Sequence, residues 1–126
     1  MNRMLREVSA CATGPARRET DGAVRMEFVF PPDFVGFEGH FPGNPIVPGI
    51  VQVMAGILTA GEGSPLRLVK VNRAKFVRII GPGETIGVVA TNTEKGGRIN
   101  AAVGVTAGGE TAASFTLVLE PVGGQQ

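Results

Sequence analysis

Strict alternation of apolar and other residues, interrupted by paired glycines, is the feature that most constrains the fold of this chain. Apolar side chains occupy every second position in residues 99–105 and again in residues 113–119. Gly96-Gly97 precedes the first run, and Gly108-Gly109 precedes the second. Because a strand turns alternate residues to one face and Gly-Gly suits tight hairpin turns, the pattern predicts consecutive antiparallel strands.

Further strands are predicted on both sides of the middle of the chain. They cover residues 24–30, 66–80 and 86–90, with a weakly patterned additional strand at about 5–12. Pro31 ends the strand at 24–30, because proline has no N–H to donate to a ladder. The segment 81–84, Gly-Pro-Gly-Glu, is typical of a turn.

One amphipathic helix is predicted in the middle of the chain. Its apolar stripe consists of Ile50, Val51, Val53, Met54, Ile57 and Leu58. Pro48 suits the first helical turn, Gly61 suits the position just after the helix, and Gly56 would let another backbone approach closely. A single helix covers only one face of such a sheet. We therefore expect an α+β fold in which an antiparallel β-sheet wraps around one central α-helix.

Length and composition indicate one globular domain over residues 1–126, with the tail at 122–126 frayed. A net charge of +1 gives no bulk attraction to nucleic acid or an anionic membrane, and the absence of Trp and Tyr removes the usual platforms for stacking bases. No stretch has the length of a membrane span, and no apolar run follows the basic N-terminus as in a signal peptide. The single cysteine, Cys11, has no partner for an internal disulfide. These features favour a cytoplasmic protein that binds neither nucleic acid nor membrane.

The most specific signal is a loop rich in glycine and proline that leads into the helix. It reads Gly39-His40-Phe41-Pro42-Gly43-Asn44-Pro45-Ile46-Val47-Pro48-Gly49. This stretch resembles the signature of the FabA/FabZ family of (3R)-hydroxyacyl-acyl-carrier-protein dehydratases, and it matches every fixed position of that signature. Weaker agreement extends from about residue 24 to residue 120. The resemblance implies a hotdog fold and a dehydratase of lipid metabolism, such as fatty acid synthesis.

Elimination of water from a 3-hydroxyacyl thioester requires a base for the α-proton and donors for the charge that grows on the thioester oxygen. His40 is the only histidine, and its ordinary pKa near neutrality suits the base. Gly49, at the start of the helix, is best placed to donate its backbone N–H to the oxyanion. The resemblance assigns these two residues the catalytic roles. It gives the substrate-binding surface to Phe41, Pro42, Gly43, Val47, Pro48 and Met54.

The chain departs from the family at one position. The family carries its catalytic Glu or Asp five residues after the glycine at the helix start, and here that residue is Met54. A thioether has no proton to give, so Met54 is expected to shape the acyl tunnel instead of acting as the acid. Four other polar residues lie near enough in sequence to replace the acid, but a structural role is expected for each: Gln52 exposed or near the cap, Glu38 and Glu62 solvated, and Asn44 forming a turn. The alternative that His40 alone acts first as the base and then as the acid stays open.

The resemblance also implies partners. The substrate would be carried on the phosphopantetheine of acyl carrier protein or on CoA, with no metal and no other cofactor. Family dimers combine the histidine of one subunit with the acid of the other, so either a homodimer or a heterodimer with a carboxylate-bearing homologue is expected. A non-catalytic acyl-thioester-binding subunit and a hotdog thioesterase are the alternatives. The basic residues Lys70, Arg73, Lys75 and Arg78 either receive an acidic carrier protein or form a solvated strand face.

Overall fold

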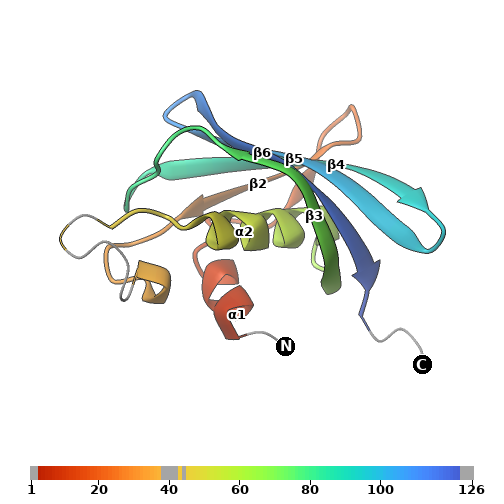
Figure 1. Cartoon of the computed structure of the whole chain (residues 1–126), viewed down its shortest axis with the longest axis horizontal. Coiled ribbons are helices and arrows are strands. Elements are labelled where there is room, and N and C mark those ends of the chain that lie inside the picture. The colour runs from red at the N-terminus through yellow and green to blue at the C-terminus, as the bar shows by residue number, and fades with distance from the viewer. Residues whose placement is uncertain (1–2, 38–42, 44, 123–126) are drawn as a thin grey trace.

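The computed structural model describes residues 3–37, 43 and 45–122 of the chain. One layer is an antiparallel sheet, and the second layer consists of helices (Figure 1). The elements are α1 (Arg3–Ser9), β1 (Arg17–Arg18), β2 (Val24–Val29), the 3-10 helix η1 (Val35–Phe37), α2 (Gly49–Gly61), β3 (Leu66–Phe76), β4 (Thr85–Lys95), β5 (Arg98–Ala107) and β6 (Glu110–Pro121). The predicted tail at 122–126 lies outside the described residues except for Val122.

The sheet has the strand order β1-β2-β4-β5-β6-β3. Strands β4, β5 and β6 form the predicted meander, and both Gly-Gly hairpins are confirmed. All four hairpin glycines have positive φ angles, between 59° and 79°, which residues with a side chain rarely adopt. The turn at 81–84 is confirmed as well, and it delivers the chain to β4 beside β2.

Strand β3 closes the sheet at its far edge by pairing with β6. The predicted strand at 66–80 is therefore too long, since β3 ends at Phe76. Beyond it, the amides of Val77 and Arg78 both reach the carbonyl oxygen of Ala112, at 2.8 and 3.2 Å, so the regular ladder cannot continue. An irregularity between Asn72 and Lys75 bends the strand earlier.

The curved sheet arches over α2 and buries one face of that helix (Figure 1). Gly56 makes the close approach: a Cβ atom there would lie 2.9 Å from Cε1 of Phe115 and 3.3 Å from Cγ1 of Val103. The approaching groups are thus side chains of β6 and β5, whereas a neighbouring backbone was expected. The predicted α+β arrangement of an antiparallel sheet around a central helix is confirmed.

The weakly patterned strand predicted at 5–12 is wrong, because most of this segment is the helix α1, which packs against α2 on the side away from the sheet (Figure 1). Met4 and Val8 are four residues apart, which is a helical spacing, and Val8 is fully buried. Only Ala12 behaves as expected for a strand, through an isolated bridge to Phe28. Among the described residues, no helix is long and apolar enough to cross a membrane.

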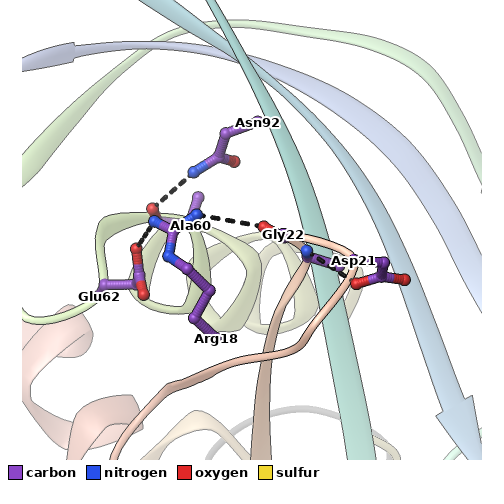
Figure 2. A network of polar contacts seen from close by, with 7 residues as sticks. Arg18, Asp21, Gly22, Ala60, Glu62 and Asn92 are labelled. Carbon is purple, nitrogen blue, oxygen red and sulfur yellow. Dashed lines mark hydrogen bonds and ion pairs between the residues drawn. The ribbon is translucent and has the colours of Figure 1, made fainter.

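The C-terminal end of α2 is tied to neighbouring segments by side chains (Figure 2). Glu62, in the left-handed conformation with φ 48°, takes the capping position predicted for Gly61, and its N–H bonds to the carbonyl of Thr59. Its carboxylate pairs with Arg18, which also donates to the carbonyl of Gly22 at 3.2 Å. From β4, Nδ2 of Asn92 donates to the carbonyl of Ala60 at 2.9 Å. These contacts anchor the C-terminal end of α2 to β1 and β4.

Candidate functional site

The start of α2 is built by Pro48 and Gly49. Pro48 is the N-cap residue, with extended φ and ψ of −64° and 153°, and its side chain makes no capping hydrogen bond. Its carbonyl accepts hydrogen bonds from the amides of Val51 and Gln52. The amides of Gly49 and Ile50 precede the first intrahelical donor and have no helical acceptor. The first turn of α2 therefore presents two amides that no backbone carbonyl of the helix satisfies, at the end where the helix dipole favours negative charge, as an oxyanion site requires.

Val47 fixes the chain that leads into the helix. Its amide donates to the carbonyl of Ile80 at 2.8 Å, and its side chain is buried. This bond joins the end of the proline-glycine loop to the segment that follows β3. This bond therefore anchors the chain two residues before Gly49.

A cavity of about 480 Å³ opens at this point, and we call it the helix-start pocket. It is lined by Ile46, Val47, Pro48, Gly49, Gln52, Phe76, Val77, Arg78 and Ile79. The ring of Phe76 lies directly over Gly49, because a Cβ atom on Gly49 would be 3.1 Å from Cζ of Phe76. A side chain at position 49 would crowd this ring, so glycine keeps the space beside its amide free for the ring and for a ligand in the pocket.

Gln52 is the one uncharged polar side chain among the residues lining the helix-start pocket. Its expected exposure is wrong, because only 5% of the residue is accessible. The predicted closeness to the cap is partly right, since Nε2 donates to the carbonyl of Val47 at 3.3 Å. Oε1 is buried and receives no hydrogen bond from any described residue. The sequence signal for this position was its place three residues after Gly49, which puts both on one side of a helix.

Met54 does not line the helix-start pocket. It lines a second, apolar cavity of about 440 Å³, which we call the apolar groove. The other lining residues are Leu5, Ile50, Val53, Ile57, Leu66, Arg67, Leu68 and Val122. Because Gln52 and Met54 are about 200° apart around the helix, they line different cavities, as expected from their spacing.

Of the residues predicted from sequence, the structure brings Val47, Pro48 and Gly49 together in the helix-start pocket and separates Met54 from them within one chain. Gly43 lies in an exposed turn with φ 81°, which explains the choice of glycine. Glu62 pairs with Arg18 and takes no part in either cavity. The remaining predicted residues lie outside the described residues: Glu38, His40, Phe41, Pro42 and Asn44.

Arg78, the charged residue that lines the helix-start pocket, forms ion pairs with two carboxylates. Arg78 contacts Glu84 at 2.9 Å and Glu110 at 2.8 Å, and these hydrogen bonds raise the pKa of its guanidinium. The amide of Gly81 donates to Glu84 at 2.7 Å and, together with Arg78 and against the opposing effect of burial, lowers the pKa of that carboxyl. Arg78 is thus a structural residue, which separates it from the basic run proposed for a carrier protein.

The other members of that run differ from Arg78. Lys70, Arg73 and Lys75 are exposed on β3, and no described carboxylate forms an ion pair with them. Within the described part of the chain, no three His, Cys, Asp or Glu side chains form a group that could hold a metal.

Comparison with known proteins places this chain in a family. The family model for ApeI-like proteins, described as ApeI dehydratase, matches residues 16–114. A 3-hydroxyacyl-[acyl-carrier-protein] dehydratase FabZ from Latilactobacillus sakei is 35% identical over 96 residues, covering 67% of this chain and 69% of that protein. A FabZ from Novosphingobium aromaticivorans is 34% identical over 74 residues, which is 50% of this chain and 47% of the relative.

Solved structures support the fold at low identity. The dehydratase heterocomplex ApeI:P from Xenorhabdus doucetiae contains a chain with TM-score 0.67 and 20% identity, covering 86% of this chain and 95% of that one. A hypothetical thioesterase with coenzyme A from Streptococcus pneumoniae gives TM-score 0.68 at 9% identity, covering 98% and 97%. Both likenesses bear on the fold alone, and they agree with the hotdog fold expected from the sequence.

Proposed function

Because the chain belongs to the ApeI-like dehydratase family, of FabA/FabZ type, we propose that it eliminates water from a 3-hydroxyacyl thioester carried on acyl carrier protein or CoA. The observation that carries this proposal is the open first turn of α2: Gly49 begins the helix and lines a cavity large enough for the head of an acyl thioester.

The proposed reaction needs few groups. His40 removes the proton from the α-carbon, and the electron pair moves toward the thioester carbonyl, where the N–H of Gly49 stabilises the negative charge. The electrons then return to form the C2–C3 double bond, and the C3–O bond breaks. The departing hydroxyl takes up a proton and leaves as water. In a chain with Met54 on the helix, protonated His40 is the available source of that proton.

The remaining predicted contacts keep the roles that the family resemblance gave them. Val47, Pro48 and, on the loop, Phe41, Pro42 and Gly43 would surround the thioester. Met54 lines the apolar groove, so it would contact the acyl chain where a dimer brings this groove beside the partner's helix-start pocket, and the apolar lining of the groove supports this role. The exposed Lys70, Arg73 and Lys75 would face the acidic carrier protein.

A second candidate is a subunit that binds acyl thioesters and completes its site with a partner. Met54 at the family's acid position favours it, and one structural neighbour comes from a complex that is named a dehydratase heterocomplex. In this arrangement a homologue would supply the carboxylate beside His40. A hotdog thioesterase is less favoured, because the helix-start loop matches the dehydratase signature.

The deciding experiment offers purified chain a 3-hydroxyacyl-acyl-carrier-protein and follows the enoyl product. We expect turnover that falls at least ~100-fold in His40→Ala and is unchanged in Thr91→Ala, an exposed position on β4. No turnover by the wild type, with activity in Met54→Glu, would favour the partnered subunit. If both the wild type and Met54→Glu bind the substrate without turnover, the proposed dehydratase activity is contradicted.

A further inference from the structure

We propose that Gln52 determines specificity for the 3-hydroxy group, by accepting a hydrogen bond from that hydroxyl through Oε1. The inference rests on the proposed function, since it names a contact to the same substrate. Gln52 is a positioning residue in this role. A neutral amide cannot protonate the leaving group, so it orients the hydroxyl and leaves the proton transfer to His40.

The orientation of the amide follows from its surroundings. Nε2 faces the carbonyl oxygen of Val47 at 3.3 Å. The reverse orientation would place two oxygens against each other, so Oε1 must be the atom that is left over. That oxygen is buried and receives no hydrogen bond from any described residue. A buried acceptor of this kind is unfavourable unless a donor arrives.

The position of Gln52 selects the donor. Gly49 and Gln52 line the same pocket and are three residues apart on α2, hence on one side of it. In a 3-hydroxyacyl thioester, only the α-carbon separates the carbonyl carbon from the carbon that bears the hydroxyl. A substrate whose carbonyl oxygen meets the Gly49 amide therefore carries its hydroxyl close to the next turn of the helix.

Among the described residues that line the pocket, Gln52 offers the side-chain acceptor for that group. Ile46, Val47, Phe76, Val77 and Ile79 contribute apolar side chains. The guanidinium of Arg78 is held by Glu84 and Glu110 and is itself a donor. The enoyl product lacks the hydroxyl donor, so the contact would favour substrate over product and assist product release.

The test compares two ligands that differ only in the hydroxyl. Binding of a 3-hydroxyacyl-CoA and of the saturated acyl-CoA of equal length is measured in the His40→Ala background, where neither turns over. We expect the hydroxyacyl ligand to bind about tenfold or more tightly than the saturated one. Adding Gln52→Leu should abolish this preference by weakening the hydroxyacyl ligand alone. Gln52→Met serves the same purpose should the leucine variant fail to fold.

Thr59→Val is the matched control, because Thr59 is a fully buried polar residue of the same helix that bonds to the carbonyl of Ala55 and lines neither cavity. The Thr59→Val variant should keep the preference for the hydroxyacyl ligand. Equal affinity of the background protein for both ligands would overturn the inference and leave the dehydratase proposal standing. An equal loss for both ligands in Gln52→Leu would also overturn it, as the sign of a purely structural role. Binding of neither ligand to the background protein would overturn the proposed function itself.

Discussion

At the scale of single residues, Glu84 shows how one carboxylate can hold a turn together. It accepts a hydrogen bond from the amide of Gly81 and pairs with Arg78, which borders the helix-start pocket. The hydrogen bond from the Gly81 amide is the largest cause of the lowered pKa of Glu84. Arg78 lowers this pKa further, and burial opposes both effects. Charge on Glu84 therefore supports the wall of the pocket as well as the turn.

This arrangement predicts an acid-dependent part of stability. The folded pKa of Glu84 lies below its ordinary value, so its contribution is complete above that value, near pH 4.5, and is lost as pH falls toward the lowered pKa. The free energy of unfolding of Glu84→Gln should lie below that of the wild type at pH 6, by no more than about 1 kcal/mol because the pair is partly exposed. The difference should shrink as pH is lowered from 4.5 through the lowered pKa, as measured by urea unfolding.

Glu94→Gln controls for the removal of one negative charge, since Glu94 is exposed on β4 and forms no ion pair with any described residue. A constant difference between Glu84→Gln and wild type across this pH range would contradict the assignment.

Sequence reasoning worked for residues whose role depends on local geometry. The glycines of the hairpins were predictable because their positive φ angles demand glycine. Gly49 was predictable as the start of the helix from the neighbouring Pro48. Gln52 was misjudged because its burial depends on Phe76 and the segment after β3, which are distant in sequence. The cap at Glu62 was missed for a similar reason: the ion pair with Arg18 holds a left-handed residue that is not glycine.

At the scale of elements, the packing of α2 against the sheet depends on Gly56. The missing side chain admits the ring of Phe115 and a methyl group of Val103, both buried. Since this contact sets the distance between α2 and the sheet, Gly56 also influences where the first turn of α2 and Gly49 lie.

Gly56→Ala should therefore destabilise the protein. The added Cβ would lie 2.9 Å from Cε1 of Phe115, and overpacking of a buried site costs about 1–3 kcal/mol. Better helix propensity would return up to about 1 kcal/mol. Gly61→Ala is the matched control in the same helix, because its Cβ would meet Leu66 at an ordinary 3.5 Å. Thermal or urea unfolding should give opposite signs for the two variants. Stabilisation by both would contradict the packing argument.

Elements with strong periodicity were predictable, and weak ones were not. Every second residue of the runs at 99–105 and 113–119 is apolar, and these runs form β5 and β6. The segment at 5–12 has apolar residues at spacings that fit either period, and its packing against α2 selects the helix. The end of β3 depends on where Ala112 can accept hydrogen bonds, which no local pattern reveals.

At the scale of the whole molecule, the edge strand β3 is largely exposed. Apolar side chains are exposed along it and just beyond it: Val69, Val71, Phe76, Val77 and Ile79. An exposed edge of this kind offers unpaired backbone groups and apolar surface to a second chain. The proposed dimer, whether of identical or homologous chains, would use this edge and bring a second α2 toward the first.

The edge yields a test of assembly. We expect the wild-type chain, alone, to dimerise through β3. Introducing Val69→Lys and Val71→Lys together should raise the dimer dissociation constant at least ~10-fold, because a two-fold axis places like charges near one another and removes apolar burial. Sedimentation equilibrium measures the constant, and Thr91→Lys, exposed on the central strand β4, controls for added charge. If turnover is lost together with the dimer in the lysine variant, the site depends on both chains. A wild type that stays monomeric at high concentration, yet dimerises with a homologue bearing the carboxylate, would replace the homodimer by the heterodimer.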